Sequence, residues 1–180
     1  MDPIRVALGL ASPAGARARL SIFIFHRVLA APDLLFPEEP DAARFDQMLG
    51  WIASWFNVLP LDEAVRLRSE GRLPPRAAAI TFDDGYADNW SVAVPLLLRH
   101  NLNATFFIAT GFLDGGCMWN DRVIATARGC ALSELDLGRL GLGSWPMDSI
   151  EASRRAIDAI IGKLKYMEGS RRDELSVAMC

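Results

Sequence analysis

Residues 80–86, Ile-Thr-Phe-Asp-Asp-Gly-Tyr, close an apolar run that starts at Ala77, and they decide the fold. The run ends abruptly in two adjacent carboxylates followed by a glycine. Ionised carboxylates are costly to desolvate unless a cation or hydrogen-bond donors meet them. A pair at the tip of a buried strand therefore indicates a bound cation or a proton-transfer task.

Asp83 and Asp84 can share one cavity only if the strand ends or twists there, because neighbouring side chains of a strand point to opposite faces. Gly85 makes this possible, since glycine adopts backbone angles closed to other residues. We expect both carboxylates at the C-terminal edge of a sheet, where α/β folds build active sites. One could bind a metal while the other accepts a proton, although a capping Asp-Asp-Gly turn without chemistry is the alternative.

Strands and helices alternate on both sides of this motif. Continuous apolar runs, typical of strands buried on both faces, cover Leu20–Val28, Ala77–Phe82 and Ala104–Gly111, and Phe56–Leu59 is a shorter candidate. Between them, amphipathic patterns predict a helix capped by Asp41, one from Pro60 towards Gly71, and one capped by Asn89 or Ser91 with Pro95 in its first turn. This alternation predicts a parallel α/β sheet or barrel.

The pattern changes beyond Gly116. Helices are predicted from Trp119 to about Arg128, from Ile150 to Met167, and from Arg171 onward, with a glycine-rich loop over residues 138–143. The C-terminal part of the chain is thus expected to be helical.

Composition bounds the function classes. With 180 residues, 51% of them hydrophobic, the chain can bury one sizeable core, and a net charge of -3 without a basic stripe argues against nucleic acid as a partner. No segment approaches the roughly 20 apolar residues of a transmembrane span. Cys117, Cys130 and Cys180 share no metal-ligand spacing and are expected to be reduced.

The first residues resemble a signal peptide only weakly. Gly9, Ser12 and Pro13 interrupt the uncharged run after Arg5, and an amphipathic helix explains it as well. A cytoplasmic location is therefore favoured, with export to the periplasm or cell surface as the alternative.

Thr81-Phe82-Asp83-Asp84-Gly85 followed by Tyr86, together with residues 104–107 (Ala-Thr-Phe-Phe) and residues 25–28 (Phe-His-Arg-Val), closely resembles the polysaccharide deacetylase family, the NodB-homology domain of carbohydrate esterase family 4. The resemblance spans residues 20–112. It implies the N-terminal portion of a distorted (β/α) barrel and metal-dependent removal of N-acetyl groups from a glycan such as poly-N-acetylglucosamine, chitin or peptidoglycan. We then expect an N-terminal helix or arm over residues 1–19, the first part of this domain over 20–116, and a helical insert over 117–180.

Carried over to this chain, the resemblance makes Asp83 the general base and Asp84 a ligand of a divalent metal, zinc in expectation. The Tyr86 amide is a candidate oxyanion donor; the alternative is that the Tyr86 phenol only shapes the pocket rim. Trp119 is a candidate for stacking on a sugar, although packing of its helix explains it equally well. Helix capping is the favoured explanation of Asp88 and Asn89.

The family's second signature, two metal-binding histidines spaced His-x-x-x-His, is absent from the 180 residues, as are its later motifs. The chain has two histidines, His26 and His100. His100 is expected to be structural at a helix end, whereas His26 either lines the pocket or is buried with a backbone partner, the latter being slightly favoured. Asp84 alone would bind zinc poorly, because zinc sites take at least three protein ligands.

These gaps predict a chain that is the N-terminal part of a deacetylase, truncated at residue 180 and inactive alone. Its exposed barrel edge predicts self-association. A non-catalytic glycan-binding or polysaccharide-assembly subunit is the main alternative. A magnesium-dependent hydrolase or phosphotransferase is a second one, which the lack of a phosphate-binding loop disfavours.

Overall fold

The computed structural model describes residues 2–179 of a mixed α/β protein, so Cys180 lies outside the described residues. The chain divides into two compact units, Met1–Ala109 and Thr110–Cys180, and each is described by itself.

The first unit is built on four parallel strands: β1 (Ser21–Phe25), β2 (Asn57–Val58), β3 (Ala77–Phe82) and β4 (Thr105–Phe106). β3 lies in the centre, paired along one side with β1 and along the other with β2 and β4. This arrangement confirms the predicted parallel α/β sheet. The sheet is open within the described residues and does not close into a barrel.

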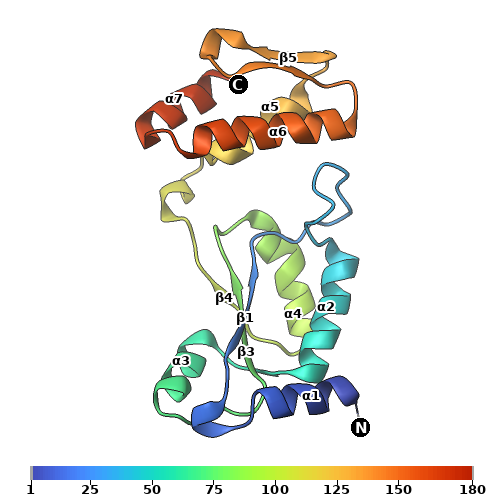
Figure 1. The fold of residues 1–180 in the computed structure, drawn as a ribbon, viewed down its shortest axis with the longest axis vertical. Coiled ribbons are helices and arrows are strands. Elements are labelled where there is room, and N and C mark those ends of the chain that lie inside the picture. Colours follow the sequence, from blue (N-terminus) through green and yellow to red (C-terminus); the bar gives the residue numbers. More distant parts are fainter. Residues whose placement is uncertain (1, 180) are drawn as a thin grey trace. The chain divides into compact units, whose positions relative to one another are not determined.

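The helices of this unit are α1 (Pro3–Ala11), α2 (Ala42–Trp55), α3 (Leu61–Ser69) and α4 (Val94–Arg99). Asp41 caps α2 as predicted, because its Oδ1 accepts a hydrogen bond of 2.8 Å from the Arg44 amide. Figure 1 shows α2 and α4 on the same side of the strands, and their apolar faces join one core cluster.

Phenylalanine rings form the centre of this core. The Phe82 ring lies 5.4 Å from that of Phe25, 5.9 Å from that of Phe45 and 4.9 Å from that of Phe106. Phe82 and Phe45 are fully buried, and burying one phenylalanine side chain contributes about 1.5–3 kcal/mol. The residue immediately before Asp83 is therefore one of the best-anchored side chains of the unit.

Two strands differ from the expectation of burial on both faces. In β1, Ile22 and Ile24 are 46% and 61% exposed, because α2 and α4 cover only the opposite face. β4 is only two residues long, and Phe107 and Ile108 beyond it are about half exposed. The continuous apolar runs indicated strands correctly but overstated their burial.

The helix after β3 starts at Ala87, earlier than predicted. Residues Asn89–Ala93 of this helix form a π-helical segment, in which the Val94 amide donates a hydrogen bond to the Asn89 carbonyl. Helix α4 follows this segment directly. Pro95 lies in the first turn of α4, as predicted, but helical residues precede it from Ala87 onward. Because proline lacks an amide hydrogen and crowds the preceding turn, a widened turn just before it accommodates the ring.

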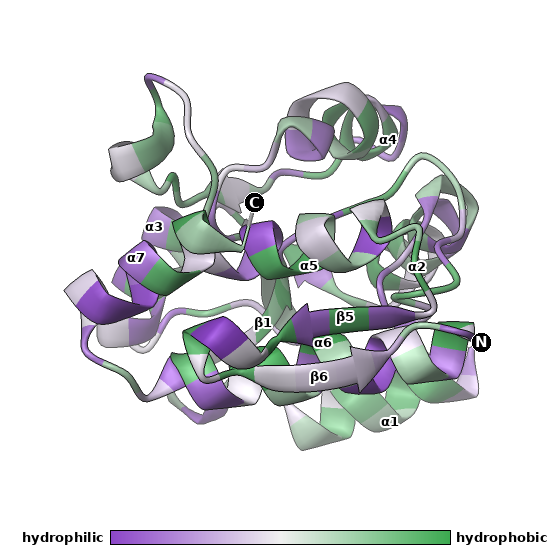
Figure 2. Cartoon of the chain, turned by 90° about the horizontal axis from the view of Figure 1, so that it is seen from above, coloured by the Kyte–Doolittle hydropathy of each residue, from purple (hydrophilic) through white to green (hydrophobic). Residues whose placement is uncertain are grey.

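The second unit contains three helices and a hairpin: α5 (Trp119–Gly129), β5 (Glu134–Leu137), β6 (Gly143–Pro146), α6 (Ile150–Lys165) and α7 (Gly169–Ala178). The three helices are confirmed. The predicted loop over residues 138–143 is essentially the connection of an antiparallel hairpin, whose strands β5 and β6 were not predicted. Hydrophilic and hydrophobic residues alternate in β5, as Figure 2 shows, and such alternation indicates a strand. In a strand of four residues the pattern is too short to be distinctive. None of the described helices is long and apolar enough to cross a membrane.

Candidate active site

The two adjacent carboxylates follow β3 in a three-residue turn. The Gly85 amide donates a hydrogen bond of 2.9 Å to the Asp83 carbonyl, and Asp84 between them has a φ of 71°. This hydrogen bond and central φ are those of a γ-turn of the strained, positive-φ type. Gly85 also has a positive φ, 75°, and a Cβ placed there would lie 2.9 Å from Ile108 Cδ1. The predicted need for glycine thus has both a conformational and a steric basis.

Neighbouring strands hold the backbone of this turn from both sides. The Asp83 amide donates to the Phe25 carbonyl (2.9 Å), and the Ala109 amide donates to the Asp84 carbonyl (3.3 Å). The turn therefore lies at the C-terminal edge of the sheet, with its strained conformation supported by the extensions of β1 and β4.

His26 lies beside Asp83 because of the strand register. β1 and β3 run parallel with Phe25 opposite Phe82, so the next residue of each strand comes to the same edge. His26 Nε2 lies 3.9 Å from Asp83 Oδ2, which is too long for a hydrogen bond but close enough for electrostatic interaction. The side chains are 54% and 39% exposed. The favoured expectation of a buried His26 is thus wrong, although its carbonyl does have a partner.

A cavity of about 310 Å³ opens beside His26, and Asp83 is not among its lining residues. His26 and Arg27 line one side of it, and Glu38, Glu39 and Arg44 contribute further charged groups. These charged groups share the lining with apolar side chains, among them Ile24, Phe25 and Met48.

Tyr86 follows the turn, and the Arg27 guanidinium lies over its ring, 4.6 Å from the centroid. Such a contact is a cation–π interaction, which fixes both side chains next to the motif. A second cavity, of about 300 Å³ and mostly apolar, is lined by Tyr86, Trp90, Phe106 and Ile108.

Asp88 and Asn89 do not cap the helix after β3, so the expectation for them is wrong. The Asp88 carboxylate accepts a hydrogen bond from Arg27 Nε (2.8 Å), and Asn89 Nδ2 donates one to the His26 carbonyl (2.9 Å). Both partners lie on the extension of β1, about 60 residues earlier in the chain. No local sequence pattern identifies such partners, because they meet only when β1 and β3 pair.

His100 is structural, as predicted, but through a different contact. Its Nε2 lies 2.7 Å from Oδ1 of Asp46 on α2, and Arg99 pairs with the same carboxylate. Hydrogen bonds from His100 and then from Arg99 lower the pKa of Asp46 below its usual value.

Trp119 belongs to the second unit. The Arg172 guanidinium lies 5.0 Å from the centre of its ring, and the indole packs on the cluster of Val123, Leu137 and Leu164. These contacts account for Trp119 as a packing residue of its own unit; its role towards a sugar stays a prediction.

A divalent metal does not fit the described residues by themselves. Within residues 2–179, no three His, Cys, Asp or Glu side chains gather as a metal site requires. A zinc ion takes at least three protein ligands, which is more than Asp84 and its described neighbours could supply.

Comparison with known proteins agrees with the motif. Residues 70–128, which contain the Asp83–Gly85 turn, match the polysaccharide deacetylase family. A curated relative is YxkH of Bacillus subtilis (strain 168), a polysaccharide deacetylase by name, which is 27% identical over 93 residues. That alignment covers 51% of this chain and 32% of YxkH, so the chain spans about a third of this relative's length.

Three solved structures are similar. A de-N-acetylase from Aggregatibacter actinomycetemcomitans is 26% identical, with a TM-score of 0.47 over 54% of this chain and 40% of the other. IcaB from Ammonifex degensii (19%, TM-score 0.47) covers 93% of this chain and 82% of its own, and the Streptococcus pyogenes deacetylase PplD in complex with acetate (15%, TM-score 0.48) covers 89% and 80%. By the sequence match and the motif it contains, the chain is similar to the polysaccharide deacetylase family.

Proposed function

We propose that the protein containing this chain hydrolyses N-acetyl groups of an amino-sugar glycan, with Asp83 as general base. The observation that carries the proposal is the strained turn that holds Asp83 and Asp84 at the C-terminal edge of β3, with His26 beside Asp83. In the reaction, Asp83 accepts a proton from the attacking water as its oxygen adds to the acetyl carbonyl carbon. The carbon–nitrogen bond then breaks, leaving acetate and a free amine on the sugar.

We further propose that His26 is the general acid of this reaction. The leaving amine needs a proton, and the exposed His26 imidazole lies at the same edge as Asp83, 3.9 Å from its carboxylate. An imidazole and a carboxylate this close can carry the acid and base roles separately. This assignment supplies a group for which the sequence motifs offered no candidate.

Asp84 is proposed as one ligand of a divalent cation, zinc in the first instance. The described residues lack a three-ligand group, so the remaining ligands are assigned to polypeptide beyond these 180 residues. The 32% coverage of YxkH supports this assignment. On the same grounds, the open four-stranded sheet is proposed to be part of a distorted barrel, whose uncovered edge promotes self-association when this chain is alone.

Acetate release from poly-N-acetylglucosamine tests the proposal. The longer protein that contains this chain is compared with its Asp83→Asn variant, which keeps the shape but cannot accept the proton. We expect Asp83→Asn to lower kcat by about 100-fold or more. Equal acetate release by both proteins would refute the assignment of Asp83.

A non-catalytic glycan-binding or assembly role is the second candidate, and the lack of a three-ligand group within residues 2–179 favours it. Zinc titration by calorimetry separates the two. Tight binding by the longer protein and its loss in Asp84→Asn support the enzyme, whereas glycan binding without zinc binding in either protein supports the second candidate.

A further inference from the structure

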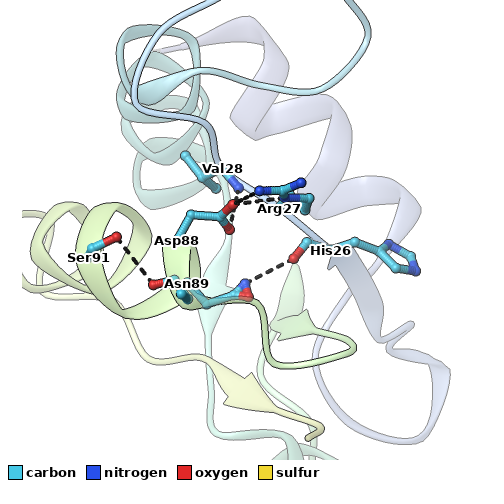
Figure 3. Close-up of polar contacts among 7 residues, drawn as sticks. His26, Arg27, Val28, Asp88, Asn89 and Ser91 are labelled. Carbon is cyan, nitrogen blue, oxygen red and sulfur yellow. Dashed lines mark hydrogen bonds and ion pairs between the residues drawn. The ribbon is translucent and has the colours of Figure 1, made fainter. Parts of the chain in front are cut away.

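Two consecutive side chains tie the end of β1 to the helix that follows β3. Asp88 Oδ2 accepts a hydrogen bond from Arg27 Nε (2.8 Å) and lies 2.7 Å from Arg27 Nη2. Asp88 Oδ1 accepts a longer one, 3.4 Å, from the Val28 amide, and Asn89 Nδ2 donates to the His26 carbonyl (2.9 Å). Figure 3 shows the result: Asp88 and Asn89 hold three successive residues of the β1 extension.

These contacts are shielded from water on the side of the helix. The Asp88 side chain is 13% exposed and Asn89 is 3% exposed, whereas the Arg27 side chain is 41% exposed. Hydrogen bonds are electrostatically stronger in such surroundings, and a charge-assisted contact between two guanidinium nitrogens and a carboxylate is among the strongest. The Arg27–Asp88 pair is therefore expected to be more persistent than the exposed ion pairs of this unit, such as Arg66–Glu70.

Among the described residues, the Asn89 side chain makes one hydrogen bond, with the His26 carbonyl. Asn89 opens the π-helical segment, a rare geometry often found at functional sites, and its Oδ1 is buried without a hydrogen-bond partner among the described residues. Leaving a buried acceptor unpaired costs stability. The Asn89 side chain is thus buried at a cost in stability, and in return its Nδ2 binds the His26 carbonyl.

The helix after β3 contacts His26 through its main chain and not through its ring. Within residues 2–179, the only polar contact recorded for the ring is the one with Asp83, and the side chain is 54% exposed. No hydrogen bond therefore fixes the ring directly, unlike His100, whose ring is bound by Asp46. The contacts of Asp88 and Asn89 act on the main chain of residues 26–28, from which the imidazole extends.

We infer that Asp88 and Asn89 are positioning residues, which hold the His26 backbone so that its imidazole stays beside Asp83. Arg27 acts with them, since its guanidinium contacts both the Tyr86 ring and the Asp88 carboxylate. The inference rests on the proposed function, because the position of the ring affects catalysis only if His26 transfers a proton.

Nuclear magnetic resonance of this chain tests the structural half of the inference. Its two histidines give two sets of imidazole signals, of which His100 is an internal control for folding. We expect Asp88→Asn, which keeps the shape but loses the charge, to shift or broaden the His26 signals while those of His100 stay in place. Glu70→Gln is the matched control, because Glu70 pairs with Arg66 and Arg72 on the surface of the same unit. Unchanged His26 signals in Asp88→Asn would overturn the inference.

Kinetics of the longer protein test the functional half. We expect Asp88→Asn to lower kcat about 10- to 100-fold, since a misplacement of about 1 Å costs up to about this much, with KM within about twofold. Arg27→Lys, which keeps the charge, should retain more of kcat than Arg27→Ala. An unchanged kcat in Asp88→Asn alongside an inactive Asp83→Asn would overturn the positioning role. If acetate release is instead unaffected by Asp83→Asn, the proposed function fails, and the resonance test still decides the structural half.

Discussion

The imidazole Nε2 of His26 lies 3.9 Å from Oδ2 of Asp83, although the two residues belong to different strands. Their proximity results from the parallel pairing of Phe25 with Phe82, which brings the following residue of each strand to the same edge. The same edge carries the turn at Asp84 and the two side chains that hold the β1 extension. The predictions below address this edge and the core that supports it.

Replacing His26 with glutamine should lower kcat for deacetylation by about 100-fold or more, because glutamine cannot donate a proton as an imidazolium does. KM should change little, since the substitution removes proton transfer and not a contact that binds the substrate in its ground state. The measurement is steady-state acetate release by the longer protein. His100→Gln is the matched control, as His100 pairs with Asp46 away from the motif; an equal loss of kcat in both variants would contradict the role of His26.

Gly85→Ala should destabilise the first unit by about 1–3 kcal/mol, because alanine is strained at a φ of 75° and its Cβ would lie 2.9 Å from Ile108 Cδ1. Urea unfolding measures the change. Gly50→Ala in α2 is the control, since its Cβ would meet only His100 Cε1 at 3.8 Å. For Gly50→Ala we expect the free energy of unfolding to rise by about 0.5–1 kcal/mol, because alanine has the better helix propensity. A Gly85→Ala protein as stable as the wild type would show that the turn adapts.

Phe82→Ala should cost about 3–5 kcal/mol, because a fully buried ring leaves a cavity between Phe25, Phe45 and Phe106. Thermal or urea unfolding of the chain provides the value. Phe107→Ala removes the same side chain from a half-exposed position nearby and should cost less than about 1 kcal/mol. Similar losses in the two variants would mean that the aromatic cluster is not the centre of the core.

Asp46→Asn should weaken the acid sensitivity of folding. His100 and Arg99 lower the pKa of Asp46 below its usual 3.8 in the folded protein. The stabilisation from its carboxylate is therefore complete above about pH 4 and is lost as the pH falls through the lower, folded-state pKa. Unfolding curves at pH 7 and near pH 3 should show a smaller difference for Asp46→Asn than for the wild type, and an identical difference would remove Asp46 from the acid response.

Local features were accessible from the sequence alone. The Asp41 cap, the need for glycine at position 85 and the amphipathic face of α6 depend on a few consecutive residues whose backbone preferences are intrinsic. The apolar run before Asp83 likewise indicated a buried strand, and the residues around it carried the family resemblance.

Tertiary structure decided which distant residues meet. The pairing of β1 with β3 brings His26 to Asp83 and gives Asp88 and Asn89 their partners, and that pairing depends on how the phenylalanine core packs. The exposure of Ile22 and Ile24 could not be predicted from the sequence either, because an apolar run does not indicate how many faces of a strand its neighbours cover. The sequence by itself thus determined the two carboxylates and the glycine that follows them. The proximity of His26 to Asp83, and the contacts of Asp88 and Asn89 with the β1 extension, required the fold.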